Sequence, residues 1–206
     1  MIDTVITEFD KGLRAVFARA QSVRAHPDAA LAESELTVEQ KRHVAAVMRV
    51  NHTGEVCAQA LYNGQALTAH NAETAQSLKQ ASAEETEHLA WCKKRIKQLG
   101  GRTSVLNPVW YAGSFALGAL AGVLGDKWSL GFLAETEHQV GRHLQSHLQK
   151  LPQADKKSRA IVQQMQQDEA HHADSAVAQG AAVLPAPVQM AMQLSSKLMT
   201  KTTYWL

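Results

Sequence analysis

Apolar residues recur through most of the chain at alternating steps of three and four residues, which places them on one face of an α-helix. β-Branched residues never alternate with polar ones over the length of a strand, and strong helix formers dominate almost everywhere. The pattern therefore predicts an all-α protein. We expect helices over about residues 2–24, 38–70, 72–99, 127–150, 156–179 and 187–204, and a further helix that begins at residues 107–108.

The starts of the predicted helices carry capping signals. Thr37 with Gln40 three residues later predicts a capping box, and Asn71 predicts the N-cap of the next helix. Asn107 followed by Pro108 predicts a cap and first-turn pair. Residues 27–36 are expected to form a connection between the first two helices.

Composition restricts the class of protein further. Of 206 residues, 45% are hydrophobic, which is enough for a substantial core. The net charge of +2 and the absence of a long basic block argue against a nucleic-acid partner. Cys57 and Cys92 show no metal or redox spacing and fit free thiols in a reducing compartment. The N-terminal residues contain acids and no apolar signal segment, so we expect a cytoplasmic location.

Acids and histidines interrupt the apolar stripes of four predicted helices near mid-length. Each histidine follows a glutamate by three residues, and each such pair has another stripe glutamate 30 or 32 residues upstream. The interrupting residues are Glu55, Glu85, His88, Glu137, Glu169 and His172. A single Glu-x-x-His sequence is a weak signal, but this repeated arrangement is hard to obtain by chance.

Buried carboxylates at these positions need positive charge nearby, because each ion taken out of water costs several kcal/mol. Two divalent cations would balance four glutamates, and two neutral imidazoles would complete the ligand set. This is the pattern of ferritin-like di-iron and di-manganese bundles. Oxygen and imidazole ligands favour iron or manganese over structural zinc. Glu85 and Glu169 are the best placed to bridge two metals, because each has a histidine one turn away.

We therefore expect a ferritin-like four-helix bundle with additional N-terminal, membrane-facing and C-terminal helices. A single domain would cover residues 1–206, with the bundle core over about residues 38–179.

Two further acids compete for ligand positions. Glu135 begins a third Glu-x-x-His sequence, but it is rotated about 200° from Glu137 around the helix and is expected to face outward. Glu84 lies four residues before His88 and shares a face with it. Glu85 is preferred because its spacing to the histidine repeats that of the second motif.

Several neighbouring residues each have two interpretations. A glycine at position 54 lowers helix stability by about 1 kcal/mol relative to alanine. Close approach of a substrate to the helix backbone would explain it, and so would close packing of a neighbouring helix. Tyr62 fits the lining of a substrate cavity or simple core packing. His52 and His143 fit either an outer shell around the metal ligands or the surface.

Four segments resemble the demethoxyubiquinone hydroxylase family of ubiquinone biosynthesis. They are NHTGEVCAQALYNGQ (51–65), EETEHLAWC (84–92), GFLAETEHQVGRHL (131–144) and DEAHHAD (168–174). The resemblance extends from about Thr37 to the C-terminus, and its metal ligands fall on the six positions chosen above. Residues 1–36 add little to it.

The resemblance implies a di-iron monooxygenase with two iron ions, in which Glu85 and Glu169 are catalytic bridging carboxylates. Its implied reaction is the dioxygen-dependent hydroxylation of 2-polyprenyl-3-methyl-6-methoxy-1,4-benzoquinol. It also implies a peripheral protein on the cytoplasmic side of the inner membrane. The electron donor and any complex with other ubiquinone-biosynthesis proteins are left open, and no dinucleotide-binding fingerprint is present.

Residues 108–125 form an uncharged segment of 18 residues, at the lower limit for a membrane-spanning helix. Its four glycines instead favour close packing or shallow insertion into a bilayer. A buried bundle helix is one alternative. The other, which the resemblance favours, is a helix that meets the bilayer together with Tyr204, Trp205 and Leu206.

Two other classes of protein share the ligand pattern. A ferritin-type storage or ferroxidase protein would use the site to load iron into a shell, which the long apolar segment disfavours. A membrane-associated scaffold would use metal only to neutralise its core.

Overall fold

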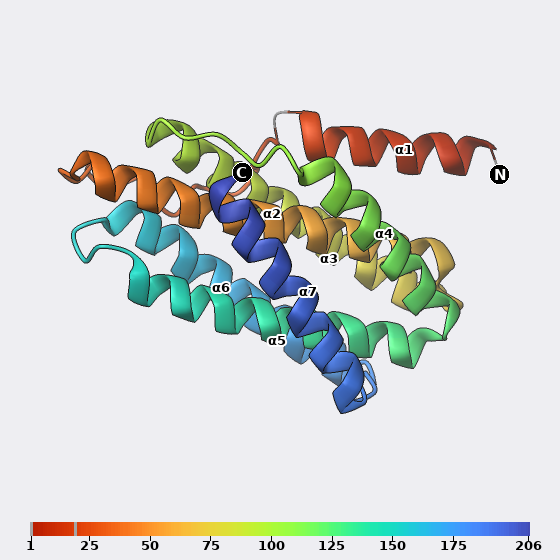
Figure 1. Cartoon of the computed structure of the whole chain (residues 1–206). Helices are drawn as coiled ribbons and strands as arrows, with labels where there is room; N and C mark the ends of the chain where they lie inside the picture. The colour runs from red at the N-terminus through yellow and green to blue at the C-terminus, as the bar shows by residue number, and fades with distance from the viewer. Residues whose placement is uncertain (1, 19) are drawn as a thin grey trace.

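The computed structural model describes residues 2–18 and 20–206, over which the chain forms seven α-helices and no β-strand (Figure 1). The helices are α1 (Ile2–Phe17), α2 (Val38–Thr68), α3 (Ala72–Gln98), α4 (Asn107–Val123), α5 (Asp126–Lys150), α6 (Lys156–Ala178) and α7 (Ala186–Trp205). The all-α prediction is confirmed.

The four longest helices form the bundle. Helices α2 and α3 make one antiparallel hairpin, α5 and α6 make the other, and the two hairpins pack against each other (Figure 1). Helix α7 crosses the bundle obliquely and packs mainly on α2, whereas α1 lies apart and contacts α2 and α4. The additional helices therefore surround one side of a four-helix core.

Two of the three predicted capping signals are confirmed. Thr37 and Gln40 form both hydrogen bonds of the capping box, and the Asn71 side chain accepts from the backbone N–H of Glu73 at 2.8 Å. The third prediction was correct for Pro108, which lies in the first turn of α4, but wrong for Asn107, which is the first residue of the helix and does not cap it. Its amide oxygen instead accepts from the Thr53 hydroxyl of α2 at 2.8 Å, a tertiary contact that the local sequence does not reveal.

The first helix is shorter than predicted and ends at Phe17 instead of near Arg24. Further along, the backbone N–H groups of Val23 and Arg24 donate to the Glu87 carboxylate of α3 at 2.9 and 3.2 Å. These donors would bond to carbonyl oxygens within a longer helix, so the contact with α3 replaces the last turns of the predicted element.

Helix α4 packs against α2 through glycines. A Cβ atom on Gly118 would lie 2.0 Å from the backbone oxygen of Leu61, and one on Gly64 would lie 2.2 Å from that of Phe115. The opposite face of α4 is not covered, since Leu120 is 63% exposed. The alternative of a fully buried helix is therefore wrong. No helix in the part of the chain described here has the length and apolar character to cross a membrane.

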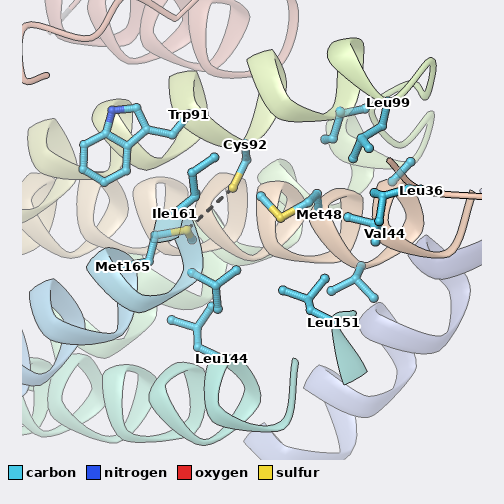
Figure 2. Packing of buried hydrophobic residues seen from close by; sticks show 14 residues of the cluster. Leu36, Val44, Met48, Trp91, Cys92, Leu99, Leu144, Leu151, Ile161 and Met165 are labelled. Carbon is cyan, nitrogen blue, oxygen red and sulfur yellow. Dashed lines mark hydrogen bonds between the residues drawn. The ribbon is translucent and has the colours of Figure 1, made fainter. Parts of the chain in front are cut away.

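One apolar core fills the bundle near the N-terminal end of α2 (Figure 2). Side chains from all four bundle helices interdigitate there, among them Met48, Leu144 and Met165. Sγ of Cys92 lies 3.7 Å from Sδ of Met165, and both cysteines are free thiols, as predicted. This core holds the two hairpins together beside the polar residues in their interior.

Candidate metal centre

The structure brings the six predicted ligand residues together in the interior of the bundle. Each of the four helices contributes at least one of them, and all are buried, His172 being the most exposed at 7%. The contributors are Glu55 of α2, Glu85 and His88 of α3, Glu137 of α5, and Glu169 and His172 of α6.

These residues form two overlapping groups of four. One group contains Glu55 and His88, the other contains Glu137 and His172, and both contain Glu85 and Glu169. Within each group, one potential ligand atom per residue lies within 4.8 Å of the others. The two shared glutamates occupy the positions from which a carboxylate can bridge two ions.

Both imidazole rings direct Nδ1 toward the carboxylates. Nδ1 of His88 lies 3.1 Å from Glu85 and 3.2 Å from Glu169. Nδ1 of His172 lies 3.2 Å from Glu169 and 3.6 Å from Glu137. A neutral histidine coordinates through the nitrogen that carries no proton, so the proton of each ring has to sit on Nε2.

Each Nε2 has an acceptor on the opposite hairpin. The Nε2–H group of His88 donates to Asp168 of α6 at 2.9 Å, and that of His172 donates to Glu84 of α3 at 2.6 Å. Burial raises the pKa of Asp168, but hydrogen bonds from His88 and Arg24 outweigh it and hold that pKa below its ordinary value. An ionised carboxylate can only accept, so these contacts fix the ring tautomer that leaves Nδ1 free for metal.

The competing acids lie outside the two groups. The Glu84 carboxylate accepts the hydrogen bond from Nε2–H of His172. The Glu135 carboxylate accepts from the Gln139 amide at 2.7 Å and pairs with Arg142 at 3.3 Å. Sequence reasoning missed Asp168 altogether. The available signal was that an acid immediately precedes the glutamate of both Glu-x-x-His sequences.

The donor set fits metal cations. One oxygen each of Glu85, Glu137 and Glu169 is buried and accepts no hydrogen bond from the described residues. Such oxygens are costly in a protein interior unless a cation offsets them. Two divalent cations would use these lone pairs and balance the four glutamates.

The pKa shifts show how strongly the cluster attracts positive charge. Burial raises the pKa of Glu137 to about 8, and the charge on Glu169 acts in the same direction. Burial also raises the pKa of Glu85 well above its ordinary value. Burial lowers the pKa of His172, but hydrogen bonds to Glu137 and Glu169 outweigh it and raise that pKa to about 12. Protons and metal ions therefore compete for the same atoms.

Tyr62 packs in an apolar core cluster with Leu61 and Leu78, as one alternative predicted, and it does not line the cavity described below. Its hydroxyl donates to the Glu137 carboxylate, and the side chain is fully buried. Burial and the charge of Glu137 raise its pKa well above the ordinary value, so the phenol keeps its proton as a hydrogen-bond donor.

His52 and His143, the two histidines considered as an outer shell, lie away from the ligand groups. His52 is buried next to the Asn107 amide of α4, and burial lowers its pKa to about 3. His143 is half-buried, and its Nδ1 lies 3.5 Å from the Ser196 hydroxyl of α7. It lines a cavity that reaches Glu55, a member of the first group.

This cavity has a volume of about 370 Å³ and lies between α2, α4, α5 and α7. Its walls are mainly apolar, with Leu61, Leu117 and Phe132 among the lining residues, and it extends to Glu55. Gly54 forms part of the wall, and a Cβ atom there would meet nothing within 4 Å. Gly54 is therefore not a packing notch for a neighbouring helix.

Fold and site together define a ferritin-like helical protein whose interior holds the four glutamates and two histidines of the dinuclear ligand pattern. The family model for ubiquinone biosynthesis protein COQ7 matches residues 42–203, and the chain belongs to this family.

Individual relatives are similar over nearly the whole chain. A 3-demethoxyubiquinol 3-hydroxylase of Chromobacterium violaceum is 61% identical over 204 residues, which cover 99% of both chains. Proteins of the same name from Laribacter hongkongensis and Nitrosospira multiformis are 61% and 60% identical over 204 residues, which cover 99% of this chain and 99% and 98% of theirs. At most two of the 206 residues lie outside these matches, so the similarity extends well into the residues before 42, which the family model leaves out.

Proposed function

We propose that this chain is a 3-demethoxyubiquinol 3-hydroxylase. It hydroxylates the ring of 2-polyprenyl-3-methyl-6-methoxy-1,4-benzoquinol with dioxygen and electrons from a separate donor. The observation that carries this proposal is that an apolar cavity large enough for a substituted ring ends at Glu55, a member of the buried ligand cluster. The names of the relatives support the same reaction.

Two iron ions are the proposed cofactor. His88 with Glu55 would hold one ion and His172 with Glu137 the other, while Glu85 and Glu169 would bridge them. When bound, the metals supply the redox chemistry that activates dioxygen. The chain supplies the ligands, the fixed histidine tautomers and a cavity whose apolar walls limit access of water. We take residues 1–206 as one functional unit around this centre.

The cavity orients the substrate. Glycine at position 54 lets the ring approach the helix backbone next to Glu55, because no side chain intervenes there. Polar atoms on the same walls come from Gln139 and His143 of α5 and from Ser196 of α7. They are suited to hydrogen-bond the ring oxygens, while the apolar lining accepts the prenyl group.

Contact with a membrane surface is part of the proposal. Large apolar side chains are exposed on α4, and α7 exposes others beside the same cavity. The exposed residues are Val109, Leu117, Leu120 and Val123 of α4, Leu124 directly after it, and Leu194, Leu198 and Trp205 of α7. An apolar surface of this kind suits a peripheral protein on the cytoplasmic side of the inner membrane, where a prenylated quinol is dissolved.

Vesicle binding tests the membrane contact. Substituting glutamate for Leu120 and Val123 should abolish co-sedimentation with phospholipid vesicles. The control is Val177→Glu, since Val177 is an exposed apolar residue on α6. A change of tryptophan fluorescence on adding vesicles is expected in the wild type. Equal binding by both variants would remove this part of the proposal.

Isotope labelling tests the reaction itself. The full chain would be loaded with Fe(II), given a short-chain quinol substrate and a chemical reductant, and exposed to labelled dioxygen. The label should enter the new ring hydroxyl, as measured by mass spectrometry. A hydroxyl oxygen derived from water would refute the proposal, as would full turnover by a Glu137→Gln variant.

A glycine pair tests the role of the cavity separately from the metal. Gly54→Leu should bind iron normally but lose most turnover, because the new side chain fills the cavity beside Glu55. Gly141→Leu is the matched control, since Gly141 is a helical glycine with open space that does not line the cavity. If both variants turn over equally well, the cavity is not the substrate site.

A further inference from the structure

Residues 20–26 lie between α1 and α2 and reach the metal centre from outside the bundle. Arg24 extends across to Asp168 of α6 and forms a bidentate pair, with Nη1 2.8 Å from Oδ2 and Nη2 3.2 Å from Oδ1. The family model begins at residue 42, so Arg24 lies outside the part of the chain that defines the family.

Asp168 connects Arg24 to a metal ligand. The oxygen that faces Nη1 of Arg24 also accepts from Nε2 of His88 at 2.9 Å. The other oxygen accepts from Gln164 at 3.0 Å. Both oxygens of the carboxylate are thus held, and its plane is fixed relative to the His88 ring. A bidentate guanidinium gives this directional control, which a single point charge does not.

Arg24 is itself held in place. Its guanidinium lies over the ring of Trp91, 4.9 Å from the ring centroid. The indole N–H of Trp91 donates to the Ser22 hydroxyl at 3.1 Å, and the backbone N–H of Arg24 donates to Glu87 at 3.2 Å. The Trp91 ring also lies 5.3 Å from the His88 ring. These contacts order the side chain in the folded protein, so little freedom remains to be lost when a metal binds.

The other half of the centre has weaker support. Glu84, the acceptor for His172, receives one further side-chain hydrogen bond, from Gln80 at 3.1 Å. Its side chain is 37% exposed, compared with 17% for that of Asp168. Within residues 2–18 and 20–206, no Lys or Arg forms an ion pair with Glu84. The two histidines therefore differ in the rigidity of their acceptors.

We infer that Arg24 is a positioning residue that acts through Asp168 on His88 and makes the metal at His88 slower to dissociate than the metal at His172. The inference rests on the proposed metal centre. Its physical basis is that an oriented carboxylate fixes the ring and increases its basicity as a ligand. Loss of such an outer partner costs typically about 10–100-fold in metal affinity.

Metal release from the full chain tests the inference. The protein would be loaded with Co(II), and its transfer to a chelator would be followed by the visible absorption of the bound ion. The wild type should release metal in two phases of unequal rate. Arg24→Ala should accelerate the slow phase about tenfold and leave the fast phase unchanged. Glu84→Gln should accelerate only the fast phase.

Two variants guard against a general loss of structure. Arg24→Lys keeps the positive charge but cannot form the bidentate pair with Asp168, and it should give an intermediate rate for the slow phase. Arg14→Ala removes an exposed pair with Asp10 on α1 and should change neither phase. Circular dichroism of each variant would establish that it is folded; should Arg24→Ala fail to fold, Arg24→Lys decides alone.

The outcomes separate this inference from the metal centre on which it rests. Binding of fewer than two ions per wild-type chain would refute the proposed centre. Binding of two ions with unchanged release from the Arg24 variants would refute only the inference. Equal acceleration of both phases would also overturn it, because Arg24 would then merely tie residues 20–26 to the bundle.

Discussion

Two glycines on α2 should respond in opposite ways to the same substitution. Gly54 and Gly64 lie in one helix, and replacement of a helix-interior glycine by alanine favours the helix by about 1 kcal/mol. A Cβ atom at Gly54 would meet nothing within 4 Å, so Gly54→Ala should realise most of this gain. In a protein of this size, about 1 kcal/mol raises the melting temperature by roughly 2–4 °C.

The same methyl group at Gly64 meets backbone atoms of α4. It would lie 2.2 Å from the Phe115 oxygen and 2.8 Å from the Ala119 nitrogen, whereas ordinary contacts begin at 3.4 Å. No side-chain rotation relieves such a contact, so α4 has to move away from α2. Overpacking costs about 1–3 kcal/mol, and a contact with backbone atoms at 2.2 Å belongs in the upper part of that range, so about 2 kcal/mol of destabilisation remains after the gain in helix propensity. Gly64→Ala should therefore melt several degrees below the wild type.

Thermal unfolding of the metal-free variants, followed by circular dichroism, measures both effects without a contribution from metal binding. Urea unfolding of the same samples gives the free-energy differences. A Gly64→Ala protein as stable as Gly54→Ala would show that α4 does not approach α2 through its backbone. Destabilisation by Gly54→Ala would show that the cavity wall at residue 54 is not open.

Three further predictions follow from the interior. Metal affinity should rise with pH. The pKa of Glu137 is raised to about 8 and that of Glu85 is raised well above its ordinary value, so metal binding has to release protons from these carboxyl groups. Titration with Co(II) between pH 6 and 8 measures the affinity, and an affinity that does not change with pH would contradict the prediction. Asp155→Asn should lower the free energy of unfolding by about 1–3 kcal/mol, because it removes the charge that pairs with buried Arg95 at 2.9 Å while Arg95 keeps its pair with Glu33. Urea unfolding is the assay, and an unchanged free energy of unfolding would refute the prediction. Tyr62→Phe should leave the fold intact but change the absorption spectrum of bound Co(II), since Glu137 loses its donor; an unchanged spectrum would exclude this role.

Much of the fold could be predicted because it depends on local patterns. The apolar periodicity, together with Pro108 for α4, identified every helix, and the capping box at Thr37 was correct to the residue. The errors arose where distant contacts decide the local structure. Asn107 bonds to Thr53 instead of capping its own helix, and Glu87 binds the backbone that would have extended α1. A single sequence gives no signal for such pairs.

The candidate site shows the same division. Its inward residues follow from helical periodicity, since a glutamate within an apolar stripe has to face the interior. The outer residues do not, because Asp168 and Arg24 lie on surfaces where acids and bases are ordinary. Their roles depend on which helix lies opposite, and that arrangement is a property of the assembled bundle.

The way in which the two hairpins share the ligand groups determines when metal can enter the protein. Each group of four takes residues from both hairpins, so neither hairpin alone could assemble a complete coordination sphere. Cofactor insertion must therefore follow the docking of the two halves, and the inserted ions would then fasten those halves to each other. A cell short of the metal would accumulate a precursor in which the two hairpins are held together less tightly and are more open to proteases.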